Sequence, residues 1–220
     1  MKVIKLTTLI VTDAHYGSPV HPSAPSIYNL LDKIEEEYHI KKIISCGDMF
    51  ELIYNTKEKV FSRFRNEVEI LSDSSTIFVV GNHDMCLIDE FENSCYSFTK
   101  KGMKYIHGYQ FEFIGKSYSE LKKFEKFCYK LSRSENKFSK LIVGGIKFKI
   151  QFPYIKGHAN SFLKKEEIVE IVSRRYPNSV FGHFHTQIFE QEAFCLNALC
   201  NGFCYVLKKN EIIPIPTKNI

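Results

Sequence analysis

The sequence predicts an α/β fold, and three observations carry that prediction. Apolar runs alternate with amphipathic stretches of helical period through the first half of the 220-residue chain. These apolar runs start about 35 residues apart, which is typical of βαβ units. Asp, His and Asn side chains follow where several of the runs end. In α/β sheets that position forms the ligand crevice, so the pattern also indicates where a site should lie.

The expected elements of the first half follow from the spacing of their apolar residues. Segment 6–12 is a short continuous apolar run, as expected of a buried strand. In segment 26–37, Ile27, Leu30 and Ile34 lie on one helical face. In order, we expect strands at 6–12, 42–45 and 76–80 and helices at 26–37 and 58–71.

The second half is richer in strand signals. Asn201-Gly202 stands between the last two expected strands and is a two-residue hairpin signal. We expect strands at 103–106, 110–114, 141–152, 179–181, 193–200 and 203–207 and helices at 118–131 and 164–175. The chain has no internal repeat and no Pro-rich linker. We therefore predict a single domain over 1–220 with a basic, helical, cap-like insertion around 115–140.

The overall composition excludes several classes of protein. With 44% hydrophobic and 25% charged residues, the chain is neither disordered nor fibrous. No apolar run is long enough to cross a bilayer, so we expect no integral membrane segment. Seven Cys in a chain without a secretory signal predict free thiols and a cytoplasmic location.

Positive charge is concentrated in residues 100–149. This stretch holds 13 Lys or Arg and four Glu, a net charge of +9, whereas the other 170 residues carry a net charge of −4. Within it, Leu121, Phe124, Cys128 and Leu131 lie on one helical face. The pattern predicts a helix packed on the core with a solvated basic face. The alternatives are a cap that attracts phosphate and a nucleic-acid surface.

Acidic and imidazole side chains recur in five clusters at the ends of expected strands. They are Asp13-Ala14-His15, Gly47-Asp48, Gly81-Asn82-His83-Asp84, His107-Gly108 and Gly182-His183-Phe184-His185. The seven candidate metal ligands among them are Asp13, His15, Asp48, Asn82, His107, His183 and His185. Seven O and N donors are too many for one ion but suit two ions that share a carboxylate. Mixed imidazole and carboxylate ligands favour Mn, Fe, Zn or Ni over Mg or Ca.

Together these clusters resemble the five ordered motifs of the calcineurin-like metallophosphoesterases. The resemblance implies a four-layer α/β/β/α sandwich with two divalent metal ions at the strand ends, Mn being the first choice. It assigns one metal to Asp13, His15, Asp48 and His185, and the other to Asp48, Asn82, His107 and His183. Asp48 would bridge the two ions.

The resemblance also implies a reaction and two catalytic residues. A metal-bridging hydroxide would hydrolyse a phosphate monoester or diester. His83 would protonate the leaving oxygen or stabilise the transition state, and Asp84 would orient the His83 ring. His158, which also adjoins a Gly, is the rival of His107 as the fourth-motif ligand, and spacing from the third motif favours His107.

The residues around the second and fourth motifs indicate which members of the family the chain resembles most. The stretches 47–51 and 107–111 are similar to those of small prokaryotic hydrolases related to UDP-2,3-diacylglucosamine pyrophosphatase. Those lipid pyrophosphatases usually carry Arg where this chain has His83, which favours a generic phosphoesterase. The alternatives are a nuclease of the DNA-repair type, which would make nucleic acid the partner, and a non-catalytic scaffold. Scaffolds of this family typically lose the residue at His83, so its presence favours catalysis.

Overall fold

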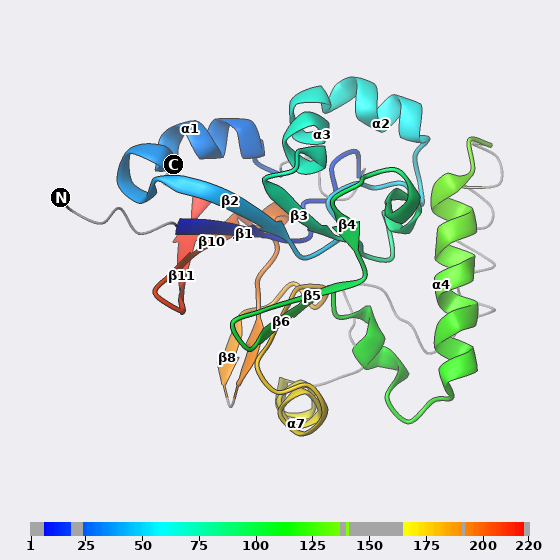
Figure 1. The fold of residues 1–220 in the computed structure, drawn as a ribbon. Helices are drawn as coiled ribbons and strands as arrows, with labels where there is room; N and C mark the ends of the chain where they lie inside the picture. Colours follow the sequence, from blue (N-terminus) through cyan, green and yellow to red (C-terminus); the bar gives the residue numbers. More distant parts are fainter. Residues whose placement is uncertain (1–6, 19–23, 137–139, 141–164, 191, 218–220) are drawn as a thin grey trace.

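The computed structural model describes residues 7–18, 24–136, 140, 165–190 and 192–217. Two β-sheets face each other, with helices on the outer face of each, as the α/β/β/α prediction requires (Figure 1). The expected strand at 141–152 and the rival ligand His158 lie outside the described residues.

The first sheet has six strands in the order β11-β10-β1-β2-β3-β4. They are β1 Thr7–Val11, β2 Ile40–Ser45, β3 Thr76–Val79, β4 Ser94–Cys95, β10 Phe203–Lys208 and β11 Glu211–Pro216. Strands β1 to β4 are parallel, whereas β10 runs antiparallel to both β1 and β11. The three strands predicted in the first half are therefore neighbours whose carboxyl ends lie at one edge.

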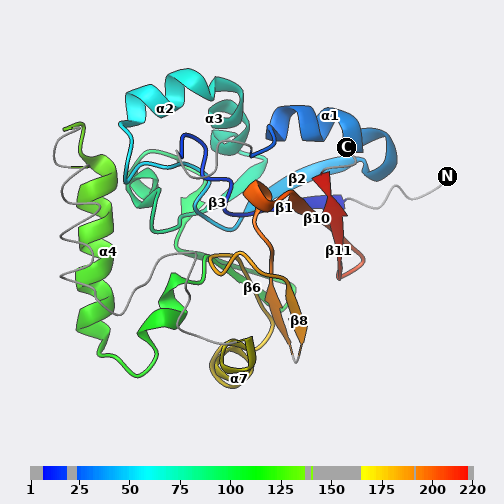
Figure 2. The same cartoon turned by 180° about the vertical axis from the view of Figure 1, so that it is seen from behind.

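The helices of the first half cover the outer face of this sheet: α1 Ile27–Tyr38, α2 Lys57–Arg63 and α3 Arg65–Ser72 (Figure 2). The side chain of Ser26 caps α1 by accepting a hydrogen bond from the Asn29 backbone N–H. The expected single helix at 58–71 is divided at Phe64, whose φ of −119° and ψ of 45° are not helical. There the Phe64 ring packs against Tyr16 at 5.0 Å between ring centroids.

The second sheet has five strands in the order β5-β6-β7-β9-β8. They are β5 Ser97–Lys100, β6 Met103–Ile106, β7 Ser179–Phe181, β8 Ile188–Glu190 and β9 Ala193–Cys195, and α7 Lys165–Arg175 covers the outer face (Figures 1 and 2). Between the sheets, Ile10, Ile44 and Val79 pack with Tyr105 and Val180. This shared core brings the ends of β1, β2 and β3 beside those of β6 and β7.

Two local predictions are wrong. The expected strand at 110–114 is the 3-10 helix η2 Tyr109–Phe113, which starts after Gly108 at a φ of 120°. Phe111 and Phe113 are both buried there, although their alternate spacing suggests a strand. The hairpin expected at 201–202 does not form, because β9 belongs to the second sheet and β10 to the first. The chain passes between the sheets through η4 Leu199–Asn201 and Gly202 at a φ of 85°.

The basic stretch 100–149 contains the helix α4 Tyr118–Arg133, which begins with a capping box between Ser117 and Glu120. Its predicted apolar face is confirmed, since Phe124 and Cys128 are buried against η2 and η1 Met85–Asp89. The exposed face carries the basic side chains Lys122, Lys123, Lys126, Lys130 and Arg133. We find no described helix with the length and apolarity to span a membrane. All seven Cys are free thiols, as predicted.

Candidate metal centre

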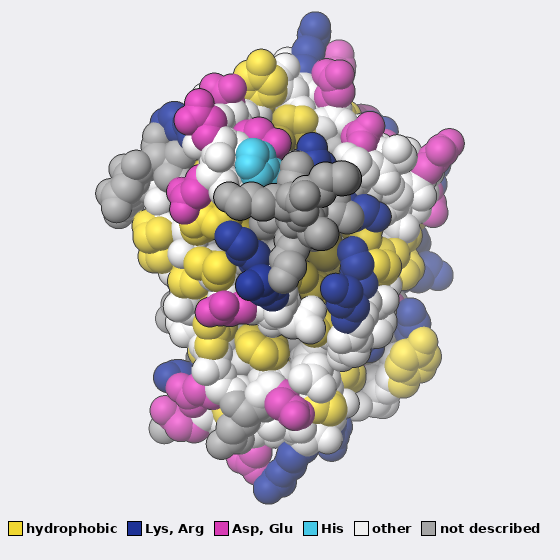
Figure 3. Space-filling view, turned by 60° about the vertical axis from the view of Figure 1, so that its left-hand side comes forward, with side chains coloured by type: hydrophobic (Ala, Val, Ile, Leu, Met, Phe, Trp, Pro, Cys, Tyr) yellow, Lys and Arg dark blue, Asp and Glu magenta, His cyan; other side chains and the backbone are white. Residues whose placement is uncertain are grey.

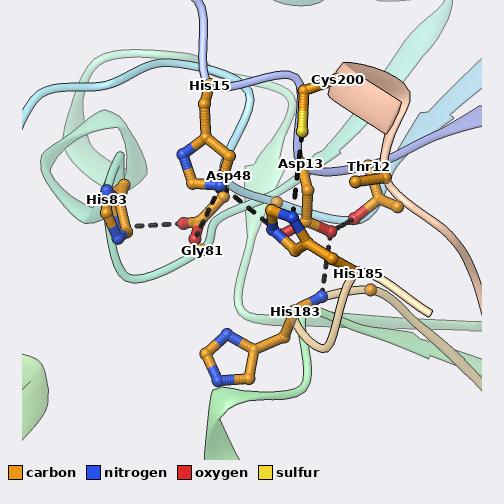
Figure 4. A network of polar contacts seen from close by, with 12 residues as sticks. Thr12, Asp13, His15, Asp48, Gly81, His83, His183, His185 and Cys200 are labelled. Carbon is orange, nitrogen blue, oxygen red and sulfur yellow. Dashed lines mark hydrogen bonds and ion pairs between the residues drawn. The ribbon is translucent and has the colours of Figure 1, made fainter. Parts of the chain in front are cut away.

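The five polar clusters converge on one place at the carboxyl ends of the strands, and Figure 4 labels residues from four of them. Three groups of possible ligands form there, and one of them is His15, Glu51 and His83. Asp13, His15 and His185 offer atoms that lie within 4.8 Å of one another, and so do Asp48, His107 and His183. The groups around Asp13 and Asp48 contain six of the seven predicted ligands.

Each of the two aspartates has one oxygen fixed by backbone and the other directed at imidazoles. Asp13 Oδ2 accepts a hydrogen bond from the His183 backbone N–H at 2.9 Å, and Asp48 Oδ1 accepts one from the His83 backbone N–H at 2.7 Å. On the other side, His107 Nε2 lies 3.3 Å from both Asp13 Oδ1 and Asp48 Oδ2. His185 Nε2 lies 3.4 Å from Asp13 Oδ1. The aspartate oxygens therefore face ring nitrogens across a shared space.

Glycines in the motifs allow this close approach of backbone to carboxylate. A Cβ at Gly81 would overlap Asp48 Oδ1, and a Cβ at Gly182 would overlap Asp13 Oδ2. At Gly47 the added carbon would lie 2.6 Å from His107 Cδ2, and φ there is +93°. No side chain is tolerated at these three positions without moving a candidate ligand.

Five candidate ligands have left-handed backbone conformations. The φ values are 51° for Asp13, 48° for His15, 52° for Asp48, 69° for His183 and 50° for His185. Such a conformation destabilises a non-glycine residue by about 1–3 kcal/mol and persists only where the surroundings impose it. Backbone strain of this kind clusters at functional sites. The centre therefore stores strain in the residues that turn side chains inward.

The electrostatics of the centre resemble those of a site built for cations. Burial by itself raises the pKa of Asp13, but hydrogen bonds and charge from His107 and His185 hold that pKa well below its usual range. Burial likewise opposes ionisation of Asp48, and the charges of His107 and His83 outweigh it, so its pKa is also held low. Although burial lowers the pKa of His107, the two aspartates raise it to about 10. These buried carboxylates therefore require positive charge beside them, which imidazolium protons or metal ions can supply.

An unsatisfied buried atom provides a test of whether metals fit. Within the described parts of the chain, no hydrogen-bond partner reaches the buried Oδ1 of Asn82. Leaving such an atom unpaired costs about 1–3 kcal/mol, which a metal ligand does not incur. The donor set is oxygen and imidazole nitrogen without thiolate, as transition ions such as Mn or Zn accept. The residues present therefore fit two divalent ions.

Glu51 is a member of the centre that the sequence analysis missed. It is 2% exposed, and its Oε1 and Oε2 lie 2.7 and 2.8 Å from His83 Nδ1. Oε2 also lies 3.3 Å from His15 Nδ1. Although burial opposes it, the charge of His83 lowers the pKa of Glu51 to about 2, and Glu51 raises the pKa of His83 to about 9. The one available signal was its place in stretch 47–51, three residues after Asp48.

Asp84 has a different place from the expected one. The resemblance implies that it orients the His83 ring, but that ring contacts Glu51 instead. Asp84 Oδ1 accepts from the Gly81 backbone N–H at 2.7 Å, and Oδ2 accepts from the Met49 backbone N–H at 2.7 Å. Asp84 therefore ties the loop after β3 to the loop after β2, because it satisfies backbone donors of both.

Glu112 is a second carboxylate that the motifs do not name. It lies in η2, and its Oε1 is 2.7 Å from His183 Nε2. Because Nε2 is bonded to a carboxylate, a metal would bind His183 through Nδ1. The wrongly predicted strand at 110–114 concealed this contact, since a strand would have directed the side chain at Glu112 differently.

The chain is thus a two-sheet sandwich with a His- and Asp-rich centre at its strand ends. The model of the calcineurin-like phosphoesterase family matches residues 6–202, and the chain belongs to this family. The motif resemblance and the fold class are thus confirmed.

Among solved structures, the chain is similar to a dimetal phosphatase from Danio rerio, with 11% identity, a TM-score of 0.47 and 95% coverage of both chains. It is also similar to a conserved uncharacterized protein, described as a predicted phosphoesterase, from Streptococcus pneumoniae, with 11% identity and a TM-score of 0.35. That match covers 94% of this chain and 86% of the other. Comparison with curated proteins gives no significant match.

Proposed function

We propose that the chain is a dimetal-dependent phosphoesterase that hydrolyses a phosphate monoester or diester. The observation that carries the proposal is the pair of ligand groups around Asp13 and Asp48, with His83 beside them. One ion would be held by Asp13, His15, Asp48 and His185, and the other by Asp48, Asn82, His107 and His183. Mn is the first choice, with Fe, Zn and Ni as alternatives. Two bound ions would activate water and neutralise charge on the phosphoryl oxygens.

The protein's own contribution to the chemistry centres on His83. Glu51 bonds Nδ1 of this ring, so Nε2 is the nitrogen that would meet the substrate. From there His83 would donate a proton to the leaving oxygen. Its backbone N–H also fixes the bridging carboxylate of Asp48, so the same residue couples metal binding to proton transfer.

The first experiment combines metal analysis with an ester screen. We expect up to two transition ions per chain and Mn-dependent hydrolysis of p-nitrophenyl phosphate, bis-p-nitrophenyl phosphate, a cyclic nucleotide or a UDP-sugar. Asp48→Ala should abolish activity and metal retention, whereas His83→Ala should keep the metals and lower turnover. A protein that stays inert and binds no metal would refute the proposal. Normal turnover of Asp48→Ala would show that Asp48 does not bridge the two ions.

If the nuclease alternative holds, the exposed basic face of α4 is a surface that nucleic acid would suit. Positive charge is not confined to that helix, because Lys41, Lys42, Lys208 and Lys209 are also exposed. Figure 3 shows further Lys and Arg side chains gathered on the face that lies on the left of Figure 1. Basic charge by itself therefore does not favour nucleic acid over a small ester. Single-stranded DNA in the same screen tests this alternative directly.

A further inference from the structure

We propose that the turn at residues 52–55 presents Tyr54 as a packing surface for an aromatic leaving group, and that Lys140 holds this turn in place. The inference rests on the proposed function, because it uses the role of His83 at the leaving oxygen. It goes further by naming the substrate class, which is a phosphate ester whose leaving group carries an aromatic ring.

The turn is tied to the candidate metal centre at both of its ends. The Leu52 backbone N–H donates to the carbonyl of His83 at 3.3 Å. At the other end, Asn55 Nδ2 donates to the carbonyl of Gly17 at 2.7 Å, in the loop that follows the first motif. Leu52 is completely buried. The turn therefore has a fixed position relative to His83.

Lys140, which follows α4 in the chain, supplies a third attachment. Its side chain is fully buried, and Nζ donates to the carbonyls of Leu52 and Asn55, each at 2.6 Å. A third, longer hydrogen bond of 3.4 Å reaches the carbonyl of Ser132 in α4. A buried ammonium is tolerated only when its donors are paired, so these carbonyls cannot move apart without exposing an unsatisfied charge. Lys140 thus joins α4 to the turn.

Tyr54 lies between these attachments, and its ring lies near the ring of His83. Its ring centroid is 6.2 Å from that of His83, at an interplanar angle of 58°. Burial and the negative charge of Glu51 raise the pKa of its hydroxyl, which places the side chain within the field of the centre. Nevertheless 47% of Tyr54 remains exposed. A large aromatic side chain fixed beside the proton donor and still open to solvent has the properties of a ligand contact.

The position relative to His83 determines what would pack on Tyr54. A leaving oxygen that receives a proton from His83 lies within hydrogen-bond reach of that ring. The group attached to this oxygen then borders Tyr54. Aromatic rings pair favourably at centroid separations of about 4.5–7 Å, whereas glycerol or choline has no ring to pair with Tyr54. The geometry thus favours esters of aromatic alcohols or of base-bearing groups.

The test compares aromatic with non-aromatic leaving groups in both ester classes. The monoesters are p-nitrophenyl phosphate and glycerol phosphate, and the diesters are bis-p-nitrophenyl phosphate and glycerophosphocholine, all with Mn. Tyr54→Ala should lower kcat/KM for the aromatic ester about 5- to 100-fold and leave the non-aromatic ester within about twofold. Tyr54→Phe should behave as wild type. Tyr28→Ala is the matched control, because Tyr28 is 55% exposed on α1.

Lys140 acts through Tyr54, so it requires a test that separates positioning from stability. Lys140→Met should reproduce the selective loss on aromatic esters, and adding Tyr54→Ala should cause no further loss, since the two changes affect one interaction. Asn55→Ala, which removes only the side-chain link to Gly17, replaces Lys140→Met if that variant unfolds.

Two results would overturn the inference. Equal losses on aromatic and non-aromatic esters in Tyr54→Ala would show that Tyr54 does not select the leaving group. Full activity of Tyr54→Ala on the aromatic esters would show that Tyr54 does not contact the leaving group. In both cases the active wild type leaves the phosphoesterase proposal standing. Wild-type inactivity toward all four esters would refute the inference, and the proposed function would fail with it only if the wild type also bound no metal.

Discussion

Two glutamates outside the metal-ligand motifs hold imidazole rings in the candidate metal centre. Glu51 contacts Nδ1 of both His83 and His15, and Glu112 contacts Nε2 of His183. A carboxylate on one ring nitrogen fixes the orientation of the ring and determines which nitrogen faces a metal or a substrate. The activity should therefore depend on these two residues as well as on the ligands.

The first prediction concerns Glu51→Gln, which preserves the size of the side chain and removes its charge. We expect kcat to fall about 10- to 100-fold because the amide holds the His83 ring less firmly, and bound metal to decrease because Glu51 also contacts His15 Nδ1. Steady-state kinetics and metal analysis measure the two effects. Glu67→Gln is the control, since Glu67 is also buried but bonds Ser26. An unchanged kcat would show that Glu51 does not position His83.

The second prediction concerns Glu112→Gln. Loss of the carboxylate partner should weaken metal binding through His183 about 10- to 100-fold, measured by titration calorimetry on the metal-free protein. Glu125→Gln is closely matched, because the two side chains are 12% and 13% exposed and Glu125 contacts Tyr109 and Lys122. Equal affinity in wild type and Glu112→Gln would contradict a role of this contact in metal binding.

At the scale of elements, the loops after the parallel strands do most to build the site. They are short, they contain left-handed residues, and the Asp84 carboxylate joins the loops after β2 and β3. Gly81 is a sensitive point in this arrangement, because a Cβ there would overlap the carboxylate of Asp48.

The third prediction is that Gly81→Ala loses at least one metal ion per chain, since Asp48 must move to admit the methyl group. Elemental analysis of the purified variant measures the loss. The control is Gly102→Ala, where φ is +79° and nothing lies within 4 Å of an added Cβ. That change should lower the free energy of unfolding by about 1 kcal/mol through strain and keep both metals. Full metal occupancy in Gly81→Ala would contradict a steric conflict between the added methyl group and the Asp48 carboxylate.

At the scale of the whole molecule, the candidate metal centre depends on how the two sheets pack against each other. Asp13 and Asp48 follow strands of the first sheet, whereas His107 and His183 follow strands of the second. Metal ions bound by both aspartates and both histidines would therefore link the two sheets and stabilise the folded state.

The fourth prediction is that removal of metal lowers the melting temperature. At a free-ion concentration of 100 times Kd, one site contributes about 2.7 kcal/mol, which corresponds to about 5–10 °C for a chain of this size. Differential scanning calorimetry with and without a chelator measures the shift, and adding Mn should reverse it. Asp48→Asn should show a much smaller shift. A melting temperature insensitive to both chelator and Mn would count against a metal centre.

Much of the fold could be predicted because it depends on local patterns. Strands β1, β2, β3, β6 and β7 and helices α1, α4 and α7 follow from the apolar spacing of their own residues. The alternation of Phe111 and Phe113 led to a wrong prediction, because a 3-10 helix that starts after Gly108 can also bury both rings. The Asn201-Gly202 pair misled because a turn signal does not specify which sheet the next strand joins.

The sequence by itself determined the donor set of the candidate site, since the ordered motifs name Asp, His and Asn side chains and their place at strand ends. Only the tertiary structure decided which residues hold those donors. Glu51 and His83 are 32 residues apart, and Glu112 and His183 are 71 residues apart. Such contacts depend on how two sheets pack and where loops return, which no local pattern encodes. The same is true of Lys140 and the turn that carries Tyr54, which lie 85 to 88 residues apart along the chain at the hydrogen bonds that join them.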